Sequence, residues 1–239
     1  MYVCPTVSLP AVGPQSACSF GFHGGARVLD VRLPAPGAQG ILEPGTPRSG
    51  MARRSPTLAL VGVFVVVYLV ELLVGLFGIK KGAFALAPPV VARPWTLVTS
   101  VYAHGSVGHL LANTVGLVLL GLVLERRTSR ARFHLFFLVT GALAGLTQVW
   151  VGALFGVRTA VIGASGAVFA LLGYVLAGNR VSDTVLSAVP LSGRAQLGAF
   201  AVVAAAVTLL TASPGVALVA HFTGLLLGLL AGQGHLLRT

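Results

Sequence analysis

The most informative stretch of this 239-residue chain is residues 159–177, TAVIGASGAVFALLGYVLA. It contains no charged residue and approaches the roughly 20 apolar residues that a helix needs to cross a bilayer. Ser165 lies inside it, within Gly163-Ala164-Ser165-Gly166. Because a polar group at membrane depth is unfavourable and usually has a function, we expect this span to carry chemistry.

Two other apolar stretches place polar side chains at a comparable depth. Ser165 lies about six residues into its predicted span and His221 about seven into the last one, or roughly 9 Å and 10 Å of helical rise. Asn113 lies about seven residues into a third span, and His109 precedes it by one turn on the same helix face. A hydroxyl, an imidazole and a carboxamide are therefore predicted to share one level of the membrane.

The whole composition agrees with a membrane protein. Hydrophobic residues make up 56% of the chain, charged residues 9%, and the mean hydropathy is +0.93, whereas about a quarter of the residues of a soluble domain are charged. We predict an all-α membrane protein, a bundle of six transmembrane helices with no inserted soluble domain. The predicted spans are 57–79, 106–124, 133–151, 159–177, 195–212 and 214–231.

The net charge of +11 does not indicate nucleic-acid binding, because the basic residues lie between and beside the spans instead of forming a stripe with aromatics. Their distribution predicts the topology. We expect a multi-pass protein, of the plasma membrane in the absence of organelle signals, with both termini in the cytoplasm. The cytoplasmic side receives Arg48, Arg53, Arg54, Arg126, Arg127, Arg130, Arg132, Arg180, Arg194 and Arg238, and the outer side Lys80, Lys81, Arg93 and Arg158.

Residues 1–50 differ from the rest of the chain. They are rich in Pro and Gly, contain no apolar run long enough to span a membrane, and hold both cysteines, Cys4 and Cys18. Two interpretations stay open: a disordered N-terminal segment, or a mis-assigned upstream extension ahead of a start at Met51. In both, residues 51–239 form the six-helix domain.

The polar residues suit acyl transfer. A serine hydroxyl becomes a nucleophile when a histidine takes its proton, so Ser165 and His221 are the candidate catalytic pair. The oxyanion that forms needs preorganised donors, for which the Asn113 amide, the Ser165 backbone N–H and His109 are candidates. Glu71 is the one acid inside a predicted span, but we favour a Ser–His dyad, with no metal and no cofactor.

Small residues support a close approach of two of these spans. Gly166, Ala170 and Gly173 recur at helical spacing after the serine, and Gly224 and Gly228 form a GxxxG just after His221. Faces of this kind allow helix backbones to approach closely in a membrane, as a short distance between serine and histidine requires.

From about Trp95 to Gln233 the chain resembles the rhomboid family of intramembrane serine proteases. The resemblance rests on HGSVGHLLAN at 104–113, ERR at 125–127, GASGAVFALLG at 163–173 and AHFTGLLLG at 220–228. These motifs occur in the family's order on three of six spans, which is far more specific than an isolated GxSG. One departure is Thr96 after Trp95, where relatives commonly carry arginine.

The resemblance implies a rhomboid-like fold and a role for each matching residue. Ser165 would be the nucleophile, His221 the base, and Asn113, His109 and the Ser165 amide the oxyanion hole. It further implies that Gly163 admits the substrate backbone, Phe169 stacks on His221, Gln148 lies near the site, and Glu125 and Arg127 form an ion pair.

We therefore expect an intramembrane serine endopeptidase that acts on single-span membrane proteins in the lipid bilayer and has no nucleic-acid partner. The alternative is a non-catalytic rhomboid-like protein that binds transmembrane helices, although such relatives typically lack the serine or the histidine. A transporter ranks third, because the sequence shows no convincing internal repeat.

Overall fold

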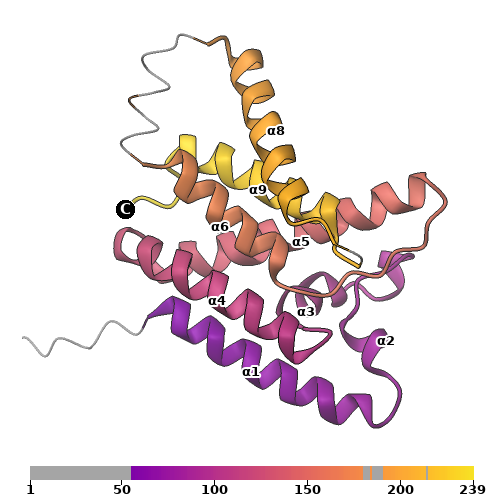
Figure 1. Ribbon diagram of the computed structural model, residues 1–239. Helices are drawn as coiled ribbons and strands as arrows, with labels where there is room; N and C mark the ends of the chain where they lie inside the picture. Colours follow the sequence, from indigo (N-terminus) through magenta and orange to yellow (C-terminus); the bar gives the residue numbers. More distant parts are fainter. Residues whose placement is uncertain (1–54, 180–183, 185–190, 214) are drawn as a thin grey trace, which may run out of the picture. The chain divides into compact units, whose positions relative to one another are not determined.

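The computed structural model describes residues 55–179, 184, 191–213 and 215–239, and this part of the chain is helical (Figure 1). The two interpretations given for residues 1–50 concern residues outside this described part. Four helices are long and apolar enough to cross a membrane, and two apolar helices are shorter. The long helices are α1 (Pro56–Gly75), α4 (Val107–Leu124), α5 (Arg130–Leu154) and α8 (Gly193–Leu210), and the shorter ones are α6 (Ser165–Ala177) and α9 (Leu218–Gln233).

Each of the six predicted spans corresponds to one of these helices, so the predicted all-α bundle of six apolar helices is confirmed. The long connection between α1 and α4 holds further short elements where the sequence pattern predicted only a loop. They are α2 (Lys80–Phe84), a 3₁₀ turn (Val90–Ala92) and α3 (Thr96–Tyr102). A second 3₁₀ turn (Glu125–Arg127) extends α4.

Helix α6 is the central element of the bundle. Its residues Ala167, Val168 and Leu171 belong to a core that includes Phe64 of α1 and Phe137 of α5. On another side, α6 contributes to a second core with α8 and α9. In Figure 1 it lies between α4 and α9. Its N-terminal end is therefore surrounded by protein. In such a place, backbone N–H and C=O groups can form hydrogen bonds with partners outside their own helix.

The predicted start of this central helix was wrong. The prediction begins at residue 159, but α6 begins at Ser165, and the segment before it is extended. Val161 and Leu86 exchange two backbone hydrogen bonds of 2.8 and 2.9 Å, and the Gly163 N–H donates to the Ser100 carbonyl at 2.9 Å. A short apolar run is compatible with either a buried extended segment or a helix, so periodicity alone could not separate them.

The last helix also begins later than predicted, at Leu218 instead of 214. His221 is thus in its first turn, not seven residues inside it. The prediction of equal depth for Ser165 and His221 therefore rested on the wrong helix starts. What the two residues do share is a position at the beginning of a helix.

The contact between α6 and α9 is made by backbone. A Cβ added at Gly224 would meet the Gly166 carbonyl oxygen, and one added at Gly228 would meet that of Ala170. A Cβ at Gly173 would lie 2.8 Å from the Leu229 nitrogen. These glycines permit the close approach that the GxxxG pattern predicted.

Candidate active site

Ser165 is the first residue of α6, and its side chain is half-buried. Its hydroxyl makes no hydrogen bond within the described ranges. The first amides of a helix have no acceptor within that helix, and the aligned peptide dipoles make this end positive. The sequence pattern did not predict this position, because it favoured a helix that starts upstream, at residue 159. Ser165 therefore lies where the helix itself favours a developing negative charge.

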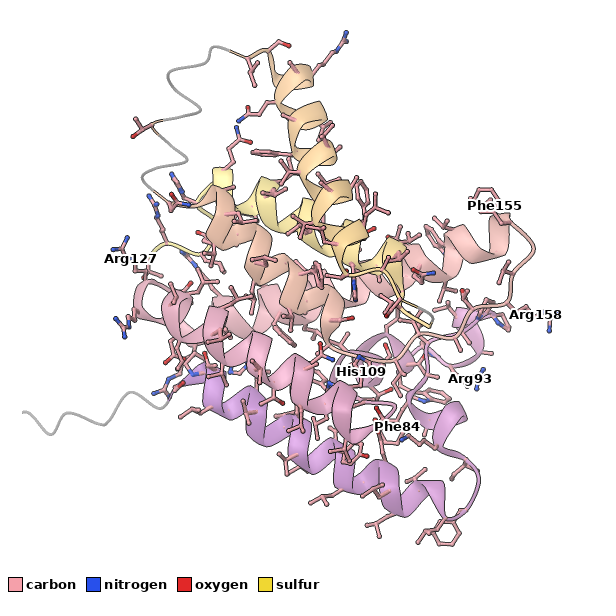
Figure 2. All side chains as sticks on the ribbon, in the orientation of Figure 1. Phe84, Arg93, His109, Arg127, Phe155 and Arg158 are labelled. Carbon is pink, nitrogen blue, oxygen red and sulfur yellow. The ribbon has the colours of Figure 1, made fainter. Side chains whose placement is uncertain are left out.

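The chain reaches Ser165 through a glycine that has a special conformation. Gly163 has φ of +131°, a region that favours glycine. A Cβ at this position would lie 2.7 Å from Nε2 of His109 and still nearer to its Cε1. The His109 ring therefore packs directly on the backbone two residues before Ser165. Figure 2 labels His109 at the end of α4 that faces this segment.

His221 is buried and held between two side chains. Its ring stacks on Phe169 with a centroid distance of 4.2 Å and an interplanar angle of 16°. Its Nδ1 lies 3.3 Å from the hydroxyl oxygen of Thr211, which follows the last residue of α8. The stack with Phe169 is the arrangement that the resemblance implied, whereas Thr211 was not among the candidate residues.

The Thr211 contact selects a tautomer for His221. The Thr211 hydroxyl also lies 2.8 Å from the Thr208 carbonyl, to which it donates its single hydrogen. Its oxygen can then only accept from His221, so Nδ1 carries the ring hydrogen. Nε2 of the neutral ring is left with a lone pair, as a general base requires.

Ser165 and His221 are brought to the same end of the α6–α9 contact. Phe169 follows Ser165 by four residues and thus lies on the same face of α6, one turn away. The ring of His221 covers Phe169. A Cβ at Gly166 would lie 3.7 Å from the carbonyl oxygen of Ala220, the residue before His221. Two independent contacts therefore bring the beginning of α9 to the beginning of α6.

Asn113 is buried on α4, one turn after His109. Its side-chain Nδ2 donates to the His109 carbonyl oxygen at 3.1 Å. One of its two N–H donors is therefore occupied within its own helix, and the other remains for a ligand. The structure places Asn113 and His109 on the same helix as predicted.

An ion pair between buried Glu71 and half-buried Lys80 holds the loop that precedes α4. Glu71 Oε1 accepts from the His104 backbone N–H at 2.8 Å, and Glu71 Oε2 lies 3.1 Å from Lys80 Nζ. Lys80 Nζ also donates to the His104 carbonyl at 3.3 Å. Glu71 is therefore a structural residue of the first loop and not a partner of His221. Lys80 was missed, although a buried acid in a span requires a partner.

The His104 ring continues this cluster toward the site. It is fully buried, packs edge-on against Phe64 at 4.8 Å, and lies 5.3 Å from the His109 ring. Burial, and secondarily His109, lower the pKa of His104 to about 4. His104 is therefore neutral at physiological pH. Its ring packs edge-on against the ring of His109 and helps to fix that ring in position.

Two further predicted residues have structural partners. Gln148 Oε1 accepts from the Ala220 backbone N–H at 3.2 Å and so holds the beginning of α9. Glu125 accepts from the Ser55 hydroxyl at 2.6 Å and the Thr57 N–H at 3.1 Å, at the start of α1. Glu125 thus caps α1, and in the described part of the chain no ion pair joins it to Arg127, contrary to the expectation.

Comparison with known proteins supports one family. Residues 91–237 match the family described as "Rhomboid domain". "RHOMBOID-like protein 4" of Arabidopsis thaliana is 34% identical over 145 residues, 60% of this chain and 34% of that protein. "RHOMBOID-like protein 1" of the same species is 35% identical over 34% of this chain and 20% of its own length.

A bacterial protein also matches. The Bacillus subtilis (strain 168) protein named "Putative rhomboid protease YdcA" is 34% identical over 82 residues, which are 34% of this chain and 40% of that protein. The matched part of the chain thus spans less than half the length of each of these three relatives.

Proposed function

This chain belongs to the rhomboid family of multi-pass integral membrane proteins, and from that premise we propose that it is an intramembrane serine endopeptidase. The proposal assigns the nucleophile to Ser165 and the general base to His221. One observation carries it: the His221 ring is stacked on Phe169, one turn along α6 from Ser165. A potential base is therefore held near the end of α6 at which Ser165 lies, which is the positive end of that helix.

The reaction proceeds through an acyl-enzyme. His221 Nε2 takes the proton of the Ser165 hydroxyl as its oxygen attacks the carbonyl carbon of the scissile peptide bond. The protonated His221 then gives that proton to the leaving amine, and the C–N bond breaks. Water, deprotonated by the same nitrogen, hydrolyses the ester and releases Ser165.

The oxyanion of the tetrahedral intermediate is stabilised by groups around the start of α6. The Ser165 N–H is a free first-turn amide, and the helix dipole adds to it. Asn113 has one N–H donor left after its bond to His109. The His109 ring lies against Gly163 and supplies a third donor. The absence of a side chain at Gly163 leaves room for the His109 ring and adds no bulk toward the substrate backbone.

The substrate class follows from the environment. Ser165 lies in an apolar bundle, so the substrate is a single-span membrane protein that approaches within the bilayer. A transmembrane helix satisfies its own peptide groups, and it must unwind locally before a peptide bond reaches Ser165. Substrates with Gly or Pro near the cleavage site are therefore cut faster.

Charge supports the orientation in which both termini are cytoplasmic, and we propose the plasma membrane as the location. Arg132 Nη1 donates to the Arg238 carbonyl at 2.7 Å, and the Thr239 N–H donates to the Arg127 carbonyl. One end of the bundle thus gathers arginines from α4, α5 and the segment after α9. Basic residues concentrate on the cytoplasmic side of such proteins, so cleavage occurs toward the opposite, outer side.

The test is cleavage of a tagged single-span substrate co-expressed at matched levels with wild type, Ser165→Ala, His221→Ala and, as a control, His134→Ala. We expect product with wild type and the control, and none with the other two. A fluorophosphonate probe should label wild type but not Ser165→Ala. Equal cleavage by Ser165→Ala would exclude this serine as the nucleophile. Neither cleavage nor labelling by the wild type would favour a protein that binds helices without cutting them.

A further inference from the structure

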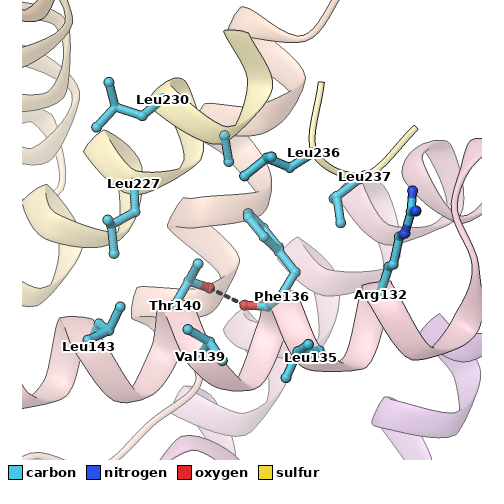
Figure 3. Close-up of a pocket in the computed structure, with 11 residues that line it drawn as sticks. Arg132, Leu135, Phe136, Val139, Thr140, Leu143, Leu227, Leu230, Leu236 and Leu237 are labelled. Atoms are coloured by element: carbon cyan, nitrogen blue, oxygen red, sulfur yellow. Dashed lines mark hydrogen bonds between the residues drawn. The ribbon is translucent and has the colours of Figure 1, made fainter. Parts of the chain in front are cut away.

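A groove lies on the opposite end of the α5–α9 contact from His221, and the proposed reaction does not use it. It has a volume of about 520 Å³ and runs along α5 from Arg132 to Leu143. Figure 3 shows Arg132, Leu135, Val139 and Leu143 in order along one wall. The opposite wall and the floor are formed by Phe136, Thr140, Leu227, Leu230, Ala231, Leu236 and Leu237.

The interior of the groove offers only hydrocarbon. Thr140 is its one uncharged polar side chain, and its hydroxyl donates to the Phe136 carbonyl at 2.7 Å (Figure 3). Apart from Arg132 at one end, no side chain that lines the groove has a polar atom without a hydrogen-bond partner. A dry apolar groove on a membrane helix takes an apolar occupant.

The shape of the groove is fixed by the rest of the protein. Phe136 packs edge-on against Tyr174 of α6 at 5.9 Å. The Tyr174 hydroxyl accepts from the Leu237 N–H at 3.1 Å, and the Thr128 hydroxyl binds the Leu237 carbonyl. The segment after α9 is therefore tied to α6 and to the start of α5. A preformed groove spares a ligand the cost of ordering its walls.

One charged side chain, Arg132, lines this groove. Of the five donors of its guanidinium, one is used by the Arg238 carbonyl. The two acidic side chains in the described ranges are engaged elsewhere, Glu71 with Lys80 and Glu125 with the start of α1. The mouth of the groove is thus positive, and an arginine fork matches a phosphate.

The length of the groove matches one leaflet. From Arg132 to Leu143 the helical rise is roughly 16 Å, about half of the ~30 Å hydrocarbon core. An occupant with its charge at Arg132 would end near the middle of the bilayer. Basic pockets between transmembrane helices are known to bind anionic lipid head groups.

We infer that this groove binds one anionic phospholipid, with an acyl chain between α5 and α9 and the phosphate at Arg132. Apolar walls, a single cationic mouth and the length of one leaflet together identify this occupant. The site is independent of Ser165 and His221, so it can be tested whether or not the protein cleaves peptide bonds.

The test uses the purified full chain and native mass spectrometry with phosphatidylglycerol and phosphatidylcholine of identical acyl chains. We expect one phosphatidylglycerol to be retained with an affinity about tenfold above that of phosphatidylcholine, as a charge-assisted hydrogen bond provides. Arg132→Gln should remove this preference. Val139→Trp, which fills the groove, should reduce retention of both lipids about tenfold.

Two matched controls locate the effect. Arg126→Gln removes another exposed arginine, and Val115→Trp adds the same ring to an exposed position of α4; both should bind as wild type does. Equal affinity for the two lipids, or equal loss with Arg126→Gln, would refute a specific site at Arg132. If the groove instead holds a second copy of the chain, the protein will be a dimer that Val139→Trp dissociates, which also refutes the inference.

Discussion

The Thr211 hydroxyl oxygen lies 3.3 Å from Nδ1 of His221, and it joins the end of α8 to the proposed base. In many hydrolases a carboxylate has this position. Here a neutral hydroxyl fixes the tautomer without adding a charge to the membrane, because its own hydrogen is donated to Thr208. The contact orients the ring but stabilises the imidazolium less than a carboxylate would.

We therefore predict that Thr211→Val lowers kcat about 10- to 100-fold, less than the about 10⁴-fold loss that follows the loss of an orienting aspartate. KM should change little, since Thr211 lies behind the ring. Thr211→Ser, which keeps the hydroxyl, should retain most activity. The measurement is steady-state cleavage across a pH range. If Thr211 orients the ring, the rate of Thr211→Val should be lower than that of wild type at every pH above the apparent pKa of the base. Equal activity of the valine and serine variants would contradict this.

Gly163→Ala should abolish cleavage, because a Cβ would displace the His109 ring and the φ of +131° disfavours alanine. Gly156→Ala is the control, since Gly156 also has positive φ, +70°, but open space around its Cα. We expect Gly156→Ala to lower stability by about 1 kcal/mol and to keep activity. Loss of activity in both variants would assign the effect to backbone strain and not to His109.

Gly228→Ala should destabilise the protein by about 3 kcal/mol or more, because the added carbon meets the Ala170 backbone, which cannot move as a side chain can. Gly62→Ala on α1 meets nothing within 4 Å and should be neutral or stabilising by up to about 1 kcal/mol. Thermal unfolding of both variants in one detergent measures the difference. A Gly228→Ala protein as stable as Gly62→Ala would show that α6 and α9 are farther apart.

Lys80→Met should destabilise the protein by about 3 kcal/mol, since it leaves the carboxylate of Glu71 buried without its cation. The double variant Lys80→Met with Glu71→Gln should be less destabilised than the sum of the single variants. This double-mutant cycle is read by unfolding of the purified proteins. Additive effects would mean that the pair is not coupled.

The lowered pKa of His104 predicts that the stability of the protein depends on pH. Its pKa in the folded protein is about 4, below the ordinary 6.5 of the unfolded chain. Between pH 6.5 and 4 the unfolded chain therefore binds more protons, so the free energy of unfolding falls as the pH falls, by up to about 3 kcal/mol. Unfolding at pH 7 and pH 4.5 should show a smaller difference for His104→Gln than for wild type. The same difference in both would exclude His104 as the source.

The sequence predicts the helices of this fold better than it predicts their ends. Strong apolar runs identify six spans, and the glycines at 224 and 228 predict which pair approaches most closely. The start of α6 could not be predicted, because residues 159–164 are as apolar as a span yet hydrogen-bond to Leu86 and Ser100. Only the tertiary structure supplies those partners.

In the candidate site, too, some residues could be predicted from the sequence and others could not. The serine and the stacked pair of Phe169 and His221 follow from motifs, whereas Thr211 comes from a helix end with no motif of its own. Lys80 was predictable in principle, because Glu71 lies in an apolar span and needs a cation. The approach of Lys80 to Glu71 depends on the turn after α1, which the sequence pattern does not define.

The short length of α6 has a consequence for the depth of its first residue. Its 13 residues extend roughly 20 Å, about 10 Å less than a typical hydrocarbon core. Because α6 lies among other helices, protein and not lipid makes up this difference, and the extended segment before Ser165 hydrogen-bonds to Leu86 and Ser100. Non-helical backbone at membrane depth is tolerated where protein surrounds it, so the shortness of α6 recesses its first residue inside the bundle instead of stretching the bilayer.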